Sequence, residues 1–160
     1  MRAELKQAGV PASIVSFLLL ACVPAAGAQA LKPDPAAVAS IRAGHHDCPR
    51  CVLAHADLTN QCVKHGNLRG AVFDGAKLVL MCMSYGDFED ASFRDADLSG
   101  ANLAHAKLGG ADLSGARLTI TSIRGADLGH AKGLSQHQLD AACGDADTKV
   151  PSPLRVKICS

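Results

Sequence analysis

The sequence contains very few aromatic residues for its apolar content. Of its 160 residues 48% are apolar, yet only 3% are aromatic, with one Tyr and no Trp. We therefore expect an interior filled by Ala, Leu and Val rather than by large rings. The high apolar content and low net charge exclude an intrinsically disordered chain, because such chains bury too little apolar surface to fold.

An excess of charge of one sign is also missing. The chain has 16 Lys and Arg residues against 15 Asp and Glu residues, a formal net charge of +1 at pH 7. This balance excludes a strongly basic nucleic-acid-binding protein and a strongly acidic protein. The sequence contains no Gly-rich phosphate loop, no His-Glu-x-x-His motif and no nucleophile elbow. It therefore predicts a protein that is not an enzyme, with no catalytic residue and no cofactor.

The main apolar run, residues 13–23, is too short to cross a membrane, which takes about 20 apolar residues. Arg2 and Lys6 give the chain a positive start, and the small residues of Ala28-Gln29-Ala30 suit a signal peptidase. Residues 1–30 are therefore interpreted as a signal peptide, which predicts a secreted or periplasmic protein without a stable membrane span.

The same segment offers a second interpretation. Leu19-Leu20-Ala21-Cys22 resembles a lipoprotein box, in which Cys22 would carry a lipid anchor. Removal of residues 1–30 leaves an even number of cysteines in a chain that enters an oxidising compartment, so disulfide bonds are expected. Six cysteines allow fifteen pairings. The six that follow residue 30 are Cys48, Cys51, Cys62, Cys82, Cys143 and Cys159.

An internal repeat of five residues runs without insertion from Cys51 to His130, in sixteen blocks such as Ala96-Asp97-Leu98-Ser99-Gly100. The third residue of every block is apolar, and the first is Ala in ten blocks. A period of five fits neither a helix nor a strand, so each block is expected to turn a corner with its first and third side chains inward. The expected core ladder includes Leu58, Leu68, Phe73, Leu78, Phe93, Leu98, Leu103, Leu108, Leu113 and Leu118.

These blocks closely resemble the pentapeptide-repeat family, whose consensus is Ala-(Asp/Asn)-Leu-x-x. The resemblance implies an all-β fold, a right-handed quadrilateral β-helix with twenty residues per coil, and about four coils for sixteen blocks. At about 4.8 Å per coil, the rod would be roughly 19 Å long. The expected organisation is an N-terminal cap over 31–50, the β-helix over 51–130, and a C-terminal helix and extended cap over 131–160, with short helices near 36–43 and 136–143.

Residues twenty apart should then stack on one another, and the charges agree with this register. The column Asp57, Lys77, Asp97 and Arg117 alternates in sign at every step. Like charges directly opposed on adjacent strands would be destabilising, and they are avoided here. The alternation therefore supports a coil of twenty residues.

Cys62 and Cys82 are twenty residues apart at the same position of their blocks. The coil spacing of about 4.8 Å falls within the Cα separation that a disulfide tolerates. A Cys62–Cys82 bridge is therefore predicted. Near-parallel Cβ directions would strain such a bond, so two free thiols are the alternative.

Cys48-Pro49-Arg50-Cys51 has three interpretations: a structural disulfide, a redox-active pair, and half of a metal site completed by His45 and His46. No βαβ unit supports the redox interpretation, and no second ligand pair supports the metal site. The structural disulfide is therefore preferred, and no metal is predicted.

Cys143 and Cys159 lie beyond the repeats, and a bridge between them would close the C-terminal segment. The capping-box sequence Ser135-Gln136-His137-Gln138 predicts the start of a short helix before Cys143. This helix and the tail are expected to cover the open end of the β-helix, where backbone groups would otherwise be unpaired.

Two outward columns carry residues of potential functional interest. His65, Tyr85 and His105 share one column, interpreted as a solvated face because histidines two coils apart are too distant to share a ligand. Leu80 and Ile120 share another, and are expected to form a small apolar patch for a partner.

The sequence therefore favours an exported, non-enzymatic scaffold that binds an unknown protein partner, in an unknown oligomeric state. One alternative is a periplasmic redox or metal-binding protein acting through Cys48, Cys51, His45 and His46. The resemblance also implies the DNA mimicry by which some family members bind gyrase. The alternating charges argue against that activity, because a duplex presents dense negative charge.

Overall fold

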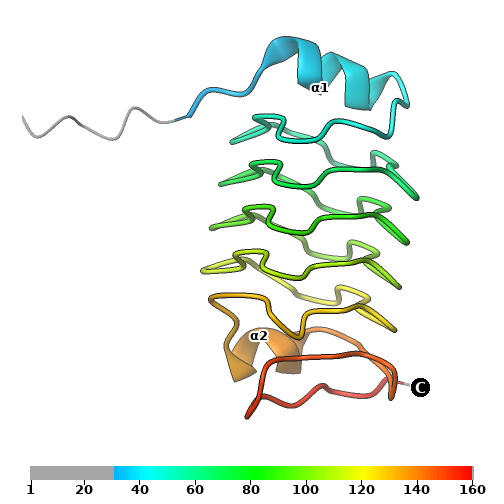
Figure 1. Ribbon diagram of the computed structural model, residues 1–160, viewed down its shortest axis with the longest axis vertical. Coiled ribbons are helices and arrows are strands. Elements are labelled where there is room, and N and C mark those ends of the chain that lie inside the picture. The colour runs from blue at the N-terminus through cyan, green and yellow to red at the C-terminus, as the bar shows by residue number, and fades with distance from the viewer. Residues whose placement is uncertain (1–30, 160) are drawn as a thin grey trace, which may run out of the picture.

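A computed structural model describes residues 31–159 of the chain. The expected signal peptide and Cys22 lie outside the described residues. The described chain has two helices, α1 (Pro35–Arg42) and α2 (Gln136–Ala141), and the coils stacked between them are joined by isolated β-bridges (Figure 1). No helix in this part of the chain is long and apolar enough to span a membrane.

The coils repeat every twenty residues. Parallel bridges join residues twenty apart in an unbroken series from Val52 and Val72 to Asp112 and Lys132. The register therefore continues two residues beyond the expected segment 51–130. It also begins before that segment. The N–H of Cys48 donates to the carbonyl oxygen of Asn67, nineteen residues on, as third-position residues do from Leu53 to Leu113.

Each block that ends between His55 and Gly125 turns its corner at the fifth residue, as does the segment that ends at Arg50. The φ angle of this residue is positive, between 54° and 73°, from Arg50 through Gly125. This left-handed conformation explains why Gly recurs at the fifth position, since Gly adopts it without steric cost. Ten other residues adopt it as well, and Ile120 is the most strained of them because β-branched residues rarely have positive φ.

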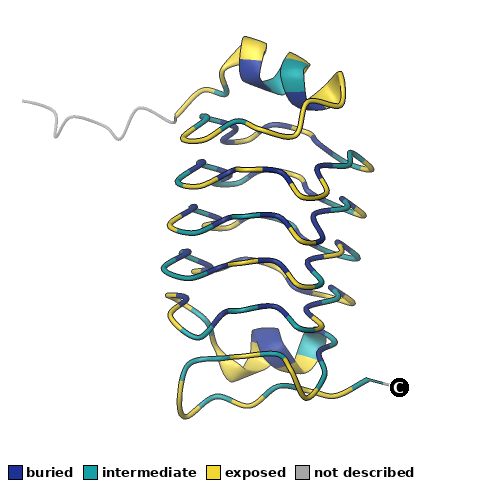
Figure 2. Cartoon of the chain, turned by 45° about the vertical axis from the view of Figure 1, so that its right-hand side comes forward, coloured by how far each residue is buried: buried dark blue, intermediate teal, exposed yellow. Residues whose placement is uncertain are grey.

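The third-position side chains form the core of the rod. From Leu53 to Leu128 they are at most 2% exposed, while the corners lie at the surface (Figure 2). Phe73 and Phe93 stack in adjacent coils with their ring centroids 4.9 Å apart, and Phe88 packs against both at an angle. The scarcity of large rings is therefore matched by a narrow interior.

Helix α1 covers the N-terminal end of the rod (Figure 1). Asp34 caps it by accepting a hydrogen bond from the N–H of Ala36, and Pro35 occupies its first turn, where no N–H is needed. Ala37 and Ile41 are buried against the first coil. The N–H of Asp34 also donates to the carbonyl of Val52, which ties the helix to the repeats.

The C-terminal segment continues the coils irregularly. Ser122 pairs with Cys143 and Asp127 pairs with Lys149, at separations of 21 and 22 residues, because α2 and a following turn interrupt the repeat. The segment 131–149 therefore forms a further, distorted coil. Residues 150–159 then cross the end of the rod, and three of them pack against the core: Val150, Leu154 and Val156.

Candidate interaction face

The four sides of the rod differ in charge. The second residue of each block projects from the middle of a side, and three sides carry charged residues there. The first has Asp57, Lys77, Asp97 and Arg117; the second has Asp87, Lys107, Asp127 and Lys149; the third has Asp112 and Lys132. The fourth side carries Cys62, Cys82, Asn102, Ser122 and, in the distorted last coil, Cys143, and we call it the uncharged face.

Exposed apolar side chains border this uncharged face along both of its edges. Leu80 and Ile120 stand on the corner that precedes it, 59% and 74% exposed. Tyr85 stands on the corner that follows it, 54% exposed. Within the repeats of the described chain, these are the large apolar side chains that are exposed, so the expected patch of Leu80 and Ile120 belongs to a wider surface.

Three rings stack along the second edge. The ring centroids of His65 and Tyr85 are 5.0 Å apart, those of Tyr85 and His105 are 4.8 Å apart, and the planes are nearly parallel. Gly125 follows in the same column, and a Cβ atom there would overlap the ring of His105. Tyr85 is therefore stacked between two imidazole rings, and the edge of its ring is the part that is exposed.

The six described cysteines lie in three pairs. Their Cα atoms are 5.5 Å apart in Cys48–Cys51, 4.5 Å in Cys62–Cys82 and 5.3 Å in Cys143–Cys159, and the structure draws a disulfide in each. The middle pair joins two coils on the uncharged face. Sulfur atoms held in a disulfide are not available as thiolate ligands for a metal.

His45 and His46 do not gather other ligands around Cys48 and Cys51. Within residues 31–159 no three His, Cys, Asp or Glu side chains are grouped closely enough to hold a metal ion. The backbone of His45 instead donates to the carbonyl of Ser40, at the end of α1. The geometry of this segment is that of a connection between helix and first coil.

The charged sides are linked by ion pairs between coils. Arg69 pairs with Glu89 as the stacking predicts. The Nε atom of Arg94 donates to Asp112, 2.6 Å away, whereas Asp74 accepts from the backbone N–H of Arg94. The charged residues of adjacent coils are thus joined partly through backbone hydrogen bonds. Each exposed ion pair contributes little stability.

Asp112 is the most strongly held of these carboxylates. It accepts hydrogen bonds from the hydroxyl and the backbone N–H of Ser114, at 2.6 and 3.0 Å, and from Arg94. The Ser114 hydroxyl, then Arg94, lower the pKa of Asp112 from 3.8 to about 2. Because the folded-state pKa is depressed, Asp112 stabilises the fold above about pH 4, and this contribution is lost as the pH falls towards 2.

Replacing Ser114 by Ala should raise the pKa of Asp112, because it removes the largest contribution to the shift. We expect an NMR titration of the Asp112 carboxyl carbon to give a midpoint near 2 in the unmodified protein and a clearly higher one in Ser114→Ala. A midpoint near 4 in the unmodified protein would contradict the hydrogen-bond arrangement.

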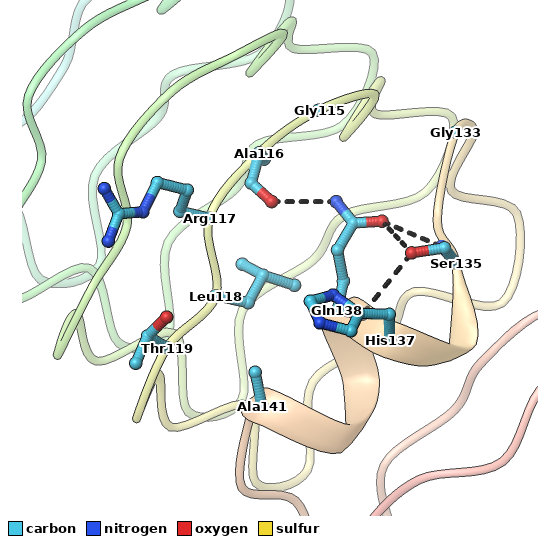
Figure 3. A pocket seen from close by; sticks show the side chains of 10 residues that line it. All are labelled: Gly115, Ala116, Arg117, Leu118, Thr119, Gly133, Ser135, His137, Gln138 and Ala141. Atoms are coloured by element: carbon cyan, nitrogen blue, oxygen red, sulfur yellow. Dashed lines mark hydrogen bonds between the residues drawn. The ribbon is translucent and has the colours of Figure 1, made fainter.

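A groove of about 470 Å³ opens between α2 and the coil above it (Figure 3). Gln138 closes one end of it, with its Nε2 atom donating to the carbonyls of Leu113 and Ala116 at 2.8 and 2.9 Å. Its Oε1 atom accepts from the N–H and hydroxyl of Ser135, which completes the capping box. The sequence pattern predicted the helix start but gave no sign of this groove.

A twenty-residue coil with an apolar third residue and a corner at each fifth residue defines a β-helix built from five-residue repeats. The pentapeptide-repeat family model matches the chain in eight copies, over residues 51–84, 82–108 and 96–132. The matched segment is just over half of the sequence, and the chain belongs to the pentapeptide-repeat family. The fold of this family is a right-handed quadrilateral β-helix. A comparison with curated proteins returned no match.

Solved structures of several pentapeptide-repeat proteins are similar to this chain. HetL from the cyanobacterium Nostoc, involved in heterocyst differentiation regulation, is 30% identical with a TM-score of 0.52; the match covers 54% of this chain and 42% of HetL. The Nostoc protein alr5209 is 26% identical with a TM-score of 0.41, over 79% of this chain and 92% of its own. The chain therefore spans less than half the length of HetL.

Proposed function

We propose that the protein is an exported, non-enzymatic scaffold that binds a protein partner through its uncharged face. The scaffold is the rod of about four coils with a helical cap at each end. The observation that carries the proposal is the concentration of exposed apolar side chains, Leu80, Tyr85 and Ile120, around one side without charge at its centre. Apolar and aromatic residues framed by polar ones are typical of protein-binding surfaces.

The rigidity of the rod supports this proposal. The Cys62–Cys82 pair and continuous backbone hydrogen bonds hold the face in one conformation, so little entropy is lost when a partner binds. Ile120 has an unfavourable positive φ although Asn60 occupies the same corner of the first coil without this strain. An exposed, strained Ile is explained if its side chain contacts a partner. The mixed-sign columns on the other sides offer no dense negative surface for DNA mimicry.

Exchange of single residues on the face tests the proposal. Tyr85→Asn and Ile120→Asn each remove an apolar contact and install a residue that tolerates positive φ. We expect each variant to weaken capture of a partner from extract of the exported compartment by about tenfold or more, the scale of an interface hot spot. Ile120→Asn should be at least as thermostable as the unmodified protein, which separates lost binding from unfolding.

Lys77→Gln provides the matched control, since Lys77 is exposed on a charged side. It should capture the same partner with unchanged affinity. Equal capture by the face variants and the unmodified protein would refute binding through this face. The first residue of the protein isolated from the exported compartment also tests export. If residues 1–30 are removed as a signal peptide, that residue is Leu31.

A further inference from the structure

Between Leu53 and Leu128, the backbone N–H groups of third- and fifth-position residues, which point towards the following coil, are satisfied with two exceptions. From Leu53 to Leu128, the third and fifth residue of every block donates its N–H towards the following coil, almost always to a carbonyl. Within residues 31–159, the N–H groups of Gly115 and Leu118 donate to nothing. Both residues line the groove beside α2.

Helix α2 is the cause of both exceptions. In a regular coil the next strand would pass below these two N–H groups, but α2 leads the chain away from that position. The side chain of Gln138 replaces only the missing donor, because its Nε2 atom bonds to the carbonyl of Ala116. The edge of this coil therefore has two free N–H donors, those of Gly115 and Leu118, whereas the carbonyl of Ala116 already accepts a hydrogen bond. It suits a ligand that only accepts hydrogen bonds.

The lining of the groove has the matching charge. Its basic members are His137 and Arg117, whose guanidinium also lies 3.8 Å from the Asp97 carboxylate. Thr119 and Ser135 add hydroxyl groups, and none of the ten lining residues is acidic. A volume of about 470 Å³ is within the usual range for a pocket that holds a small molecule.

The protein uses carboxylates elsewhere to satisfy open donors of its coils. At the C-terminal end, where the register is lost, the Oδ1 atom of Asp145 accepts from the N–H of Gly125 at 2.9 Å. At the N-terminal end, the Oδ1 atom of Asp47 accepts from the N–H of Asn67 at 2.8 Å. No carboxylate accepts from the N–H of Gly115 or Leu118; the Asp95 side chain lies beside Gly115 on the side of the preceding coil, away from the groove.

From these observations we infer that the groove beside α2 binds the carboxylate group of a small organic acid. The carboxylate oxygens accept from the N–H groups of Gly115 and Leu118, below the side chains of α2. This site is separate from the uncharged face and does not depend on the proposed partner.

Titration of the ¹⁵N-labelled protein with succinate, followed by amide NMR, tests the inference. The amide signals of Gly115 and Leu118 should move downfield and saturate. Gly110 is the matched internal control, because it is also a fifth-position Gly but donates to His130. Sodium chloride at equal ionic strength should leave all three signals in place. Absence of saturable shifts with succinate, or equal shifts at Gly110, would overturn the site.

Two variants and a second anion sharpen this test. Ala141→Leu fills the groove from α2 and should abolish the shifts, while His137→Gln should weaken binding several-fold by removing a basic group. Unchanged thermal unfolding of Ala141→Leu shows that the fold is kept. Inorganic phosphate should bind more weakly than succinate, and preference for phosphate would overturn the assignment to a carboxylate. Succinate shifts that persist in Ala141→Leu would place the ligand elsewhere.

Discussion

Phe93→Ala is expected to destabilise the protein by about 3–5 kcal/mol, the usual cost of deleting a fully buried aromatic ring. Phe93 is 0% exposed and contacts the rings of Phe73 and Phe88. The coils above and below are held by hydrogen bonds and cannot collapse into the cavity, which places the cost at the high end of the range. Urea unfolding monitored by circular dichroism measures it.

Phe93→Leu is the control, because Leu occupies the third position in ten of the sixteen blocks. It retains most of the buried volume and should cost only about 1–2 kcal/mol. Similar losses for Ala and Leu, or a loss below about 1 kcal/mol for Ala, would show that Phe93 does not fill the centre of the rod.

Replacing Cys62 and Cys82 together by Ala should destabilise the protein by about 3 kcal/mol. The bond closes a loop of twenty residues, and its removal increases the conformational freedom of the unfolded chain by about that amount. The stacked coils and their hydrogen bonds persist, so the folded variant should keep the same circular dichroism spectrum. Thermal or urea unfolding of the oxidised protein and the double variant provides the comparison.

Reduction of the unmodified protein is the matching control. Dithiothreitol should lower the stability of the unmodified protein more than that of the double variant, because the variant lacks one of three bonds. An unmodified protein that yields free thiols at Cys62 and Cys82 on mapping would contradict the pairing. Equal stability of the oxidised protein and the variant would contradict its stabilising role.

Much of the rod can be predicted from the sequence because its repeats are local and have no insertions. A single rule, an apolar third residue every five positions, places the large core side chains of the third positions from Leu53 to Leu128. The register of twenty then brings Cys62 to Cys82 and Phe73 to Phe93. Because each coil contacts only its neighbours, a regular repeat in the sequence predicts the three-dimensional arrangement directly.

The C-terminal coil was beyond such reasoning because the repeat ends there. Helix α2 and the turn near Asp145 add residues, so that Ser122 pairs with Cys143 rather than with the residue twenty positions on. The groove and its two open donors arise from this insertion and follow no pattern in the sequence. Expecting only a cover over the open end missed that the chain continues the coil.

The uncharged face was also incompletely predicted. The sequence shows the columns of Leu80 with Ile120 and of His65 with Tyr85, but not that they lie on either side of one face. Only the order of the corners around the rod shows that both columns border the side that carries Cys62 and Cys82. The left-handed conformation at the fifth position likewise required the structure, because ten residues other than Gly adopt it.

Site-specific photo-crosslinking tests the proposed interaction face most directly. A photo-reactive residue is placed either at position 102, in the middle of the uncharged face, or at position 77, on a charged side; Asn102 and Lys77 are both exposed. After irradiation in the native compartment, position 102 should give one discrete adduct that Tyr85→Asn abolishes, and position 77 should give none. Adducts of equal yield at both positions, or from position 77 alone, would contradict binding through the uncharged face.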